Sequence, residues 1–330
     1  MGKVSIDFSL KNIWKSWFAF RRGKKITKEI DDFSYHLEER LYNLCKELNR
    51  GTYHHGGYHT FTVVDNKPRV ISVASLRDRV VHRLMYAYLT SIYDKTFIYD
   101  VWSCRKHKGL VGAIQRTQTF LRNNHKDFIW RADIAKFFDN VDKQTLINII
   151  KRRVSDPKAL WLLEKIIFSY PDSILSKDIK CVAKSIPIGN LTSQIFANIY
   201  LNELDRFVVH MLHPKHYLRY GDDFIIISKD KMKVIVYRKQ IITFLKESLH
   251  LVINPKYDKI LRVNEGIHFL GVEMFSTGRS LKSRNWQQVK QRLNTKNAGS
   301  YSGLIKQHSN EKTIKEFDWM ILEKLNEELY

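Results

Sequence analysis

Two β-rich runs separated by Gly221-Asp222-Asp223 limit what this chain can fold into more than any other feature. Residues 217–220 and 224–227 are rich in strand-forming types, and a short link containing Gly and Asp between such runs predicts a β-hairpin. The hairpin carries two adjacent carboxylates at its tip, which is unfavourable unless a cation or a raised pKa compensates. The alternative interpretation is an ordinary type I′ turn, because Gly and Asp are favoured turn residues.

A third carboxylate, Asp133, follows the predicted strand 128–132. An acid at a strand end can lie beside a hairpin tip of the same sheet, so we expect three carboxylates around one site. Mg²⁺ prefers oxygen ligands and leaves room for substrate phosphates. Two such ions, roughly 3.5–4 Å apart, stabilise the attacking and leaving oxygens of nucleotidyl transfer. The three acids together therefore indicate metal-dependent nucleotidyl transfer.

The net charge points to the same kind of substrate. Lys and Arg total 56 against 34 Asp and Glu, so the formal charge is +22. A polyanionic partner is the simplest explanation. Nucleic acid is favoured over an anionic membrane surface, and a merely solvated basic surface is the alternative. The basic segment 103–126 suits a phosphate contact or a solvated helix face, and the basic segment 279–312 suits a nucleic-acid clamp.

The cysteines and the apolar runs bear on cellular location. Cys45, Cys104 and Cys181 are far apart and form no CxxC pair, which argues against a disulfide framework and a zinc knuckle. The apolar cluster 14–20 is interrupted by Lys15 and is too short for a signal peptide. No run reaches the length of a membrane span. We expect a cytoplasmic protein with no membrane partner.

No repeat, low-complexity stretch or linker divides the chain, so we expect one continuous architecture. Apolar periodicity and turn signals predict its elements. Helices are expected over 26–50, 76–93, 142–153, 158–169, 193–209 and 232–250, and hairpins over 58–73 and 266–275.

The acids lie in segments that resemble the motifs of reverse transcriptases. Ala132-Asp-Ile-Ala-Lys-Phe-Phe-Asp139 is similar to motif A, Ile186-Pro-Ile-Gly-Asn-Leu-Thr-Ser-Gln194 to motif B, and Tyr220-Gly-Asp-Asp223 to motif C, in matching order and spacing. The resemblance covers roughly residues 35–310. Further segments resemble the fingers of bacterial retroelement enzymes, motif D, and motif E or primer grip: residues 69–83, 244–259 and 268–272.

This resemblance implies an α+β fold of the right-hand polymerase type and the activity of an RNA-directed DNA polymerase. An N-terminal extension and fingers are expected over 1–125, a palm with an antiparallel sheet over 126–278, and a short helical thumb over 279–330. Fingers helices are inserted into the palm at about 142–185. We expect no large maturase, RNase H or endonuclease domain after Gly271; if RNA removal or target nicking is needed, we expect other proteins to supply it.

The resemblance also implies roles for the acids. Asp133, Asp222 and Asp223 are the expected catalytic metal ligands, with the Ile134 carbonyl completing the coordination. The implied cofactor is a pair of Mg²⁺ ions, for which Mn²⁺ can substitute. Asp139 matches a family acid too, but a helix N-cap is an adequate structural reason for it.

Other residues match the family's contacts to the incoming nucleotide. Phe138 matches the steric gate that excludes a ribose 2′-OH and so favours deoxynucleotides; core packing beside its neighbour is the alternative. Arg69 falls where the fingers contact the triphosphate, which a guanidinium binds well, and Lys67 is a weaker candidate. Lys256 lies near the motif D lysine proposed to protonate pyrophosphate, although Lys259 competes for the alignment.

Motif B narrows the choice within the family. Group II intron and retron enzymes usually have Gln-Gly followed by Ser-Pro, whereas here Ile188-Gly189 is followed by Ser193-Gln194. This pattern resembles the reverse transcriptases of diversity-generating retroelements, as does Ser300-Tyr-Ser-Gly303. In that family the changed motif accompanies errors opposite template adenines, and we expect Ile188, Gly189 and Gln194 to contact substrate. The alternative is a retron-like or antiphage-defence enzyme.

The implied partners are a structured template RNA, the nascent cDNA, dNTPs and a small basic accessory protein. The basic, aromatic segment 14–28 suits an RNA or partner-protein contact better than a membrane. His54, His55 and His59 lie in a loop with no nearby Cys, which disfavours a metal site. Competing functions are a catalytically silent RNA-binding subunit, against which the three acids argue, and an RNA-synthesising polymerase, against which Phe138 argues.

Overall fold

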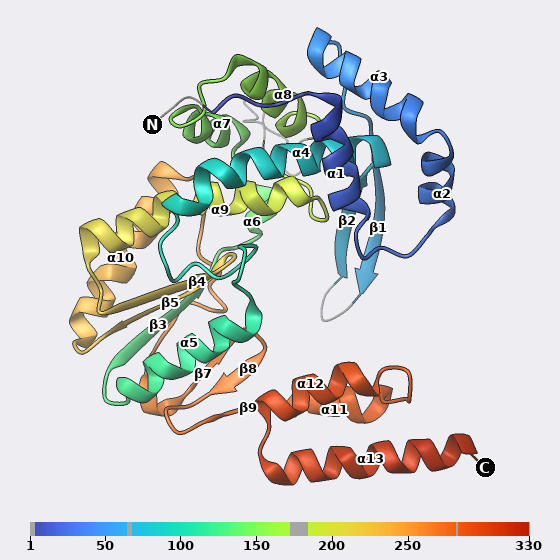
Figure 1. Cartoon of the computed structure of the whole chain (residues 1–330). Helices are drawn as coiled ribbons and strands as arrows, with labels where there is room; N and C mark the ends of the chain where they lie inside the picture. The colour runs from blue at the N-terminus through green and yellow to red at the C-terminus, as the bar shows by residue number, and fades with distance from the viewer. Residues whose placement is uncertain (1–3, 65–67, 172–183, 282, 330) are drawn as a thin grey trace.

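The computed structural model of the chain describes residues 4–64, 68–171, 184–281 and 283–329. Figure 1 shows a layer of helices above an antiparallel sheet, and a separate group of C-terminal helices that is reached through short strands. The first elements are α1 (Leu10–Arg21), α2 (Lys28–Tyr35), α3 (Leu37–Arg50), β1 (Tyr58–Val64), β2 (Pro68–Ala74), α4 (Leu76–Tyr93) and α5 (Leu110–Asn123).

The central part alternates strands and helices. Its elements are β3 (Phe128–Asp133), α6 (Phe137–Asn140), α7 (Lys143–Lys151), α8 (Pro157–Ile167), α9 (Leu191–Phe207), β4 (His216–Tyr220), β5 (Asp223–Ser228), α10 (Lys231–Ser248) and β6 (Lys259–Arg262). A small sheet and three helices follow: β7 (Ile267–Phe269), β8 (Val272–Met274), β9 (Arg279–Leu281), α11 (Ser283–Arg292), α12 (Ala298–His308) and α13 (Glu311–Leu329).

The central sheet has the strand order β4-β5-β3-β6, and every neighbouring pair is antiparallel. Successive side chains of a strand face opposite sides of a sheet. Trp130 and Phe224 face a core shared with α9 and α10, whereas Ile129 and Ile225 face a second core shared with α5 and the β7–β8 hairpin. Both faces of the sheet are covered, and residues 224–227 of β5 accordingly form a continuous apolar run.

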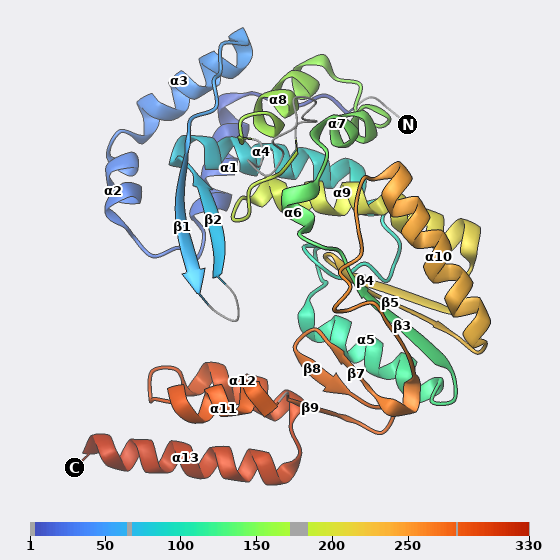
Figure 2. The ribbon, with the colours of Figure 1, turned by 180° about the vertical axis from the view of Figure 1, so that it is seen from behind.

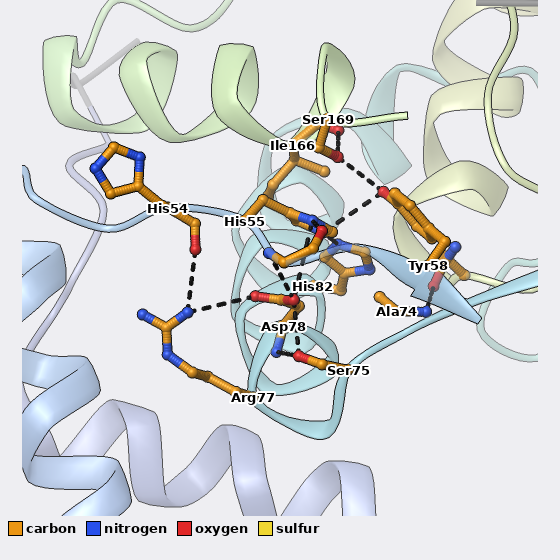
Figure 3. A network of polar contacts seen from close by, with 12 residues as sticks. His54, His55, Tyr58, Ala74, Ser75, Arg77, Asp78, His82, Ile166 and Ser169 are labelled. Atoms are coloured by element: carbon orange, nitrogen blue, oxygen red, sulfur yellow. Dashed lines mark hydrogen bonds and ion pairs between the residues drawn. The ribbon is translucent and has the colours of Figure 1, made fainter. Parts of the chain in front are cut away.

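A buried polar network joins the start of the β1–β2 hairpin to α4 (Figure 3). The carboxylate of Asp78, which is fully buried, accepts hydrogen bonds from the Tyr53 hydroxyl at 2.7 Å and the Gly56 amide at 3.0 Å. Beside this carboxylate, the ring of His55 stacks on the ring of His82, and their Nε2 atoms are 2.9 Å apart. Since buried polar groups are stable only when hydrogen-bonded, this network fixes where the hairpin leaves the helical layer.

The prediction of one helix over residues 26–50 was wrong, because the chain breaks there into α2 and α3. His36, between them, has φ −108° and ψ 31°, which is outside the helical range. α2 packs against α4 while α3 packs against α1, so each apolar face meets a different helix and the axis must turn. Gly51, with φ 72°, caps the C-terminus of α3.

Three of the six Lys and Arg residues of the basic segment 103–126 make contacts within the fold. Arg105 forms an ion pair with Asp94 at 2.9 Å, and Arg116 forms one with Asp100 at 2.9 Å. The ammonium of Lys108 lies over the ring of Tyr99, 3.5 Å from its centroid. These contacts favour a structural role for the segment over the phosphate contact. Within the described ranges, no helix has both the length and the apolar character needed to cross a membrane.

Candidate active site

The tip of the β4–β5 hairpin carries the tandem acids. Tyr220 pairs with Asp223, so Gly221 and Asp222 form a two-residue turn. Gly221 has φ 65°, whereas Asp222 is not among the residues with positive φ. A type I′ turn needs positive φ at both positions, and a type II′ turn needs it only at the first. The predicted hairpin is confirmed, but the type I′ geometry is not.

The end of β3 lies beside this tip, as the sequence predicted. Asp133 is directly opposite Asp223 in the β3–β5 ladder. One residue further on, the Ile134 amide donates a 3.2 Å hydrogen bond to the Asp222 carbonyl. The pairing of two antiparallel strands therefore brings the three acids to one edge of the sheet.

The acids influence one another electrostatically. The pKa of Asp222 is raised to about 6, first because burial disfavours its charged form and next because of the negative charge of Asp133, with a smaller effect from Asp223. Arg69 of β2 acts in the opposite direction and lowers this pKa. The Arg69 side chain, which is exposed, therefore lies close enough to the acids to act on Asp222. Lys67 lies outside the described residues.

Arg131, which the sequence analysis did not single out, binds the carboxylate of Asp223, the second of the tandem acids. Its Nε and Nη2 donate to the two carboxylate oxygens of Asp223 at 3.2 and 3.0 Å. The guanidinium also lies over the rings of Tyr257 and Phe269, at 4.7 and 5.8 Å from their centroids, and donates to the His268 carbonyl. Arg131 thus ties Asp223 to the β7–β8 hairpin.

Asn254 is a second residue that the sequence analysis missed. Its backbone amide donates to the Asp133 carbonyl at 2.8 Å, and its side-chain Nδ2 donates to the Asp133 carboxylate at 3.0 Å. It lies in the chain between α10 and β6, within the segment that resembles motif D. Lys256 follows two residues later with an exposed side chain. Asn254 thus orients the Asp133 carboxylate. Lys256, the candidate for protonating pyrophosphate, lies on the same segment.

A buried ion pair supports the turn from below. Arg219 and Asp205 are fully buried, with hydrogen bonds of 2.7 and 2.6 Å joining the guanidinium to both carboxylate oxygens. The Nη1 of Arg219 also donates to the Gly221 carbonyl at 2.8 Å. The Tyr217 hydroxyl completes the group by donating to Asp205 at 2.7 Å. Because the pair contacts the turn itself, it determines where the tandem acids lie.

The aromatic pair after β3 is divided between two environments. Phe137 is buried in the core, whereas Phe138 is half-buried at its edge, and their rings meet edge to face at 5.3 Å. The Phe138 carbonyl accepts a 2.8 Å hydrogen bond from the Ile186 amide, which ties this segment to the one before α9. The predicted N-cap at Asp139 was wrong. Asp142 caps the next helix by accepting from the Thr145 amide at 2.7 Å.

The predicted substrate residues before and within α9 lie at different depths. Ile188 is half-buried, Gly189 is exposed, and Gln194 is exposed in the first turns of the helix. Ser193, which precedes Gln194, is buried instead, and its hydroxyl has no hydrogen-bond partner among the described residues. Ile188 and Gln194 therefore have accessible surface, as a residue that touches substrate requires.

The donor set suits a hard divalent ion bound together with its substrate. In the described part of the chain, no three acidic, His or Cys side chains form a ready-made metal cluster. Asp133 and Asp222 form an acidic pair whose mutual repulsion a cation relieves, while Asp223 is engaged by Arg131. Mg²⁺ is commonly held by one or two carboxylates together with substrate phosphates and water. The residues present fit that mode of binding.

The antiparallel sheet brings a strand-end acid beside an acidic hairpin tip, with helices behind it, which is the arrangement expected of a right-hand polymerase. The model of the reverse transcriptase (RNA-dependent DNA polymerase) family matches residues 57–274, which is more than half of the chain. The chain belongs to this family. Its members are RNA-directed DNA polymerases, a class of nucleotidyltransferase, and generally use divalent metal ions.

Individual relatives are distant and are matched only in part. Protein YkfC of Escherichia coli is 26% identical over 247 residues, which are 63% of this chain and 63% of that protein. The group II intron-encoded protein LtrA of Lactococcus lactis is 26% identical over 206 residues, which are 61% of this chain and 33% of that protein. A telomerase from Candida albicans, solved in complex with a TWJ fragment of telomeric RNA, shares the fold with TM-score 0.51 at 12% identity, over 74% of this chain and 49% of that one.

Proposed function

We propose that this protein copies an RNA template into cDNA by two-metal nucleotidyl transfer. The proposal rests on the acidic pair Asp133 and Asp222 together with Arg69. The positive charge of Arg69, on β2, lowers the pKa of Asp222 and so lies near the pair. A paired acid site with a guanidinium near it suits a nucleoside triphosphate with its magnesium, because a guanidinium binds phosphate oxygens and carboxylates hold the metal.

The chain's own residues then have distinct tasks. Asp133, Asp222 and the Ile134 carbonyl would hold the ions, and Asp223, oriented by Arg131, would complete the acidic set. When bound, the ions stabilise the charge on the attacking and leaving oxygens. Arg69 binds the triphosphate. The other proposed substrate contacts follow the family motifs: Phe138 against the sugar, Ile188, Gly189 and Gln194 near the templating base, and Lys256 near the departing pyrophosphate.

We further propose the domain assignment that the family motifs imply. Residues 1–125 form the N-terminal extension and fingers, 126–278 the palm, and 279–330 the thumb, with α7 and α8 as the inserted fingers helices. The net charge of +22 supports a nucleic-acid partner. A structured template RNA, the nascent cDNA and a small basic accessory protein are the proposed partners, in the cytoplasm.

Within the family, motif B supports a diversity-generating enzyme that makes errors opposite template adenines. Ile188 stands where a polar side chain is usual, and its apolar side chain removes a contact that would otherwise penalise a misplaced base. The Ile188→Gln variant should therefore lower misincorporation opposite adenine. A retron-like or antiphage-defence enzyme is the alternative, for which faithful copying by the unmodified protein would be the sign.

Primer extension on RNA with Mg²⁺ tests the proposal. Wild-type protein should extend with dNTPs in preference to rNTPs, and sequencing of the product should show errors concentrated at template adenines. The Asp222→Ala and Asp223→Ala variants should lose extension while retaining the wild-type melting temperature. If extension is absent even with the cognate RNA and accessory protein added, the catalytic proposal is wrong and a silent RNA-binding subunit becomes the better reading.

A further inference from the structure

The outer edge of β2 is occupied by the chain that leads into α9. The Ser72 amide donates to the Ile188 carbonyl at 2.8 Å. The Asn190 side chain makes the other two bonds: its Nδ2 donates to the Ser72 carbonyl at 2.9 Å, and its Oδ1 accepts from the Ala74 amide at 3.3 Å. In both overall views this chain runs beside β2 (Figures 1 and 2). Three backbone groups of β2 are satisfied in this way.

The Asn190 side chain makes hydrogen bonds to β2 of the kind that a neighbouring strand would make with its backbone. A carboxamide carries one acceptor and a donor group in the arrangement of a peptide bond, so it can bridge a carbonyl and an amide of a neighbouring strand. Asn190 is 3% exposed, so water cannot readily replace either bond if the carboxamide is removed. Asp cannot do the same, because an ionised carboxylate has no donor for the Ser72 carbonyl.

Gly189 permits the close approach. Its φ is +118°, which side chains rarely adopt, and a Cβ at this position would lie 2.8 Å from Ile71 Cγ2 and 3.2 Å from the Ser72 carbonyl oxygen. The turn before α9 is therefore pressed against β2 at a distance that only glycine allows. Gly189 and Asn190 together determine the register between two segments that are more than a hundred residues apart.

The two ends of this junction bear proposed substrate residues. Ile188 belongs to the turn itself, and Arg69 lies three residues before Ser72 on β2, about 10 Å away at the rise of a strand. The β1–β2 hairpin extends outward with its far residues exposed, among them Val64 and Val70. Contacts near its base must therefore determine where Arg69 lies.

We infer that Asn190 is a positioning residue, which locks β2 to the turn before α9 and so holds Arg69 and Ile188 in one fixed register. The inference rests on the function proposed above, and it deepens it. Asn190 acts through the strand and does not itself touch the nucleotide. Loss of its carboxamide frees the β1–β2 hairpin, so the triphosphate contact of Arg69 suffers while the acidic site stays intact.

Hydrogen exchange tests the structural half of the inference on the full-length protein without nucleic acid. In the Asn190→Ala variant, amides of residues 70–74 should exchange at least about tenfold faster. The matched control is Asn124→Ala, since Asn124 is also buried and donates one hydrogen bond, to the Phe120 carbonyl at 2.6 Å. The control should leave these amides unchanged. Equal protection of β2 in Asn190→Ala and wild type would overturn the inference, whether or not the protein polymerises.

Steady-state extension tests the functional half. Asn190→Ala should raise the KM for dNTP about tenfold, change kcat less than about threefold and leave template-primer affinity unchanged. In an Arg69→Ala background the same substitution should have little further effect, because the two residues act through one strand. Fully additive effects would overturn the inference. If the wild-type protein makes no DNA under any condition, the proposed function is wrong. The hydrogen-exchange experiment then tests the positioning role of Asn190 by itself.

Discussion

Arg131 and Asp223 form a two-point ion pair between neighbouring strands, although they are 92 residues apart in sequence. Arg131 is opposite Ile225 in the β3–β5 ladder, and Asp223 is opposite Asp133. The two partners are therefore diagonal neighbours on one face of the sheet, a separation that a long side chain can span. The pair holds one of the three acids in a defined orientation.

The first prediction concerns this pair. Arg131→Met keeps much of the packing on Tyr257 and Phe269 but removes the charge, and Arg131→Lys keeps the charge but not the two-point geometry. Both variants should lower kcat/KM for dNTP incorporation by roughly tenfold or more, about 1.4 kcal/mol for each factor of ten, with Met the more severe. Single-nucleotide extension at saturating template-primer measures this. A faster variant would show that the pair instead holds Asp223 back from the reaction.

The buried pair Arg219 and Asp205 should also contribute strongly to the stability of the fold. Asp205→Asn leaves the guanidinium of Arg219 buried without its counter-charge, and we expect the free energy of unfolding to fall by about 3–5 kcal/mol. Glu203→Gln is the matched control, because its partner Arg152 is 64% exposed and an exposed pair contributes about 1 kcal/mol or less. Urea unfolding compares the two variants, and equal losses would contradict the prediction.

His82 should make the fold sensitive to mild acid. His55 donates from Nδ1 to the Gly56 carbonyl at 2.6 Å, so its Nε2 accepts from His82, and the Nδ1 of His82 has no partner among the described residues. Burial first, and then the neighbouring His55, lowers the pKa of His82 to about 3; Asp78 opposes this shift, and Arg79 adds a smaller lowering effect. Protonating His82 therefore places an unpaired charge in the core.

The sign of this effect follows from the two states. The pKa of His82 is 6.5 in the unfolded chain and about 3 in the folded chain. The stability that comes from a neutral His82 is therefore fully present above about pH 6.5, and it is lost as the pH falls from 6.5 towards 3. The loss approaches 1.4 kcal/mol per pH unit. Urea unfolding between pH 7.5 and 5 should show this slope in wild type, a smaller slope in His82→Gln, and an unchanged slope in His54→Gln. An unchanged slope in His82→Gln would refute the assignment.

Phe138 should control the preference for dNTPs over rNTPs without contributing much to the stability of the core. Its ring is half-buried while Phe137 fills the core, so Phe138→Ala should fold and should lower the preference for dNTPs over rNTPs by at least about tenfold. Phe137→Ala should cost about 3–5 kcal/mol of stability and leave the preference unchanged. Competition between dNTP and rNTP at a single template position measures both. Unaltered selectivity in Phe138→Ala would return this residue to a packing role.

Local signals in the sequence predicted much of the site. Alternating and continuous apolar runs, with Gly221 between them, predicted the β4–β5 hairpin and its acidic tip, because strand period and turn chemistry depend on neighbouring residues only. Asp133 could be placed beside the tip because a strand end has few possible neighbours in a small sheet. The break at His36 could not be predicted, since it depends on which helices α2 and α3 meet.

The sequence alone determined the kind of chemistry, the main strands and helices, and the three acids at one edge of a sheet. The tertiary structure alone decided which polar side chains hold the acids and the proposed substrate residues in place. Arg131, Arg219, Asn254 and Asn190 each reach a partner on a distant segment. Local sequence patterns do not reveal these contacts, because the contacts depend on the relative placement of whole elements.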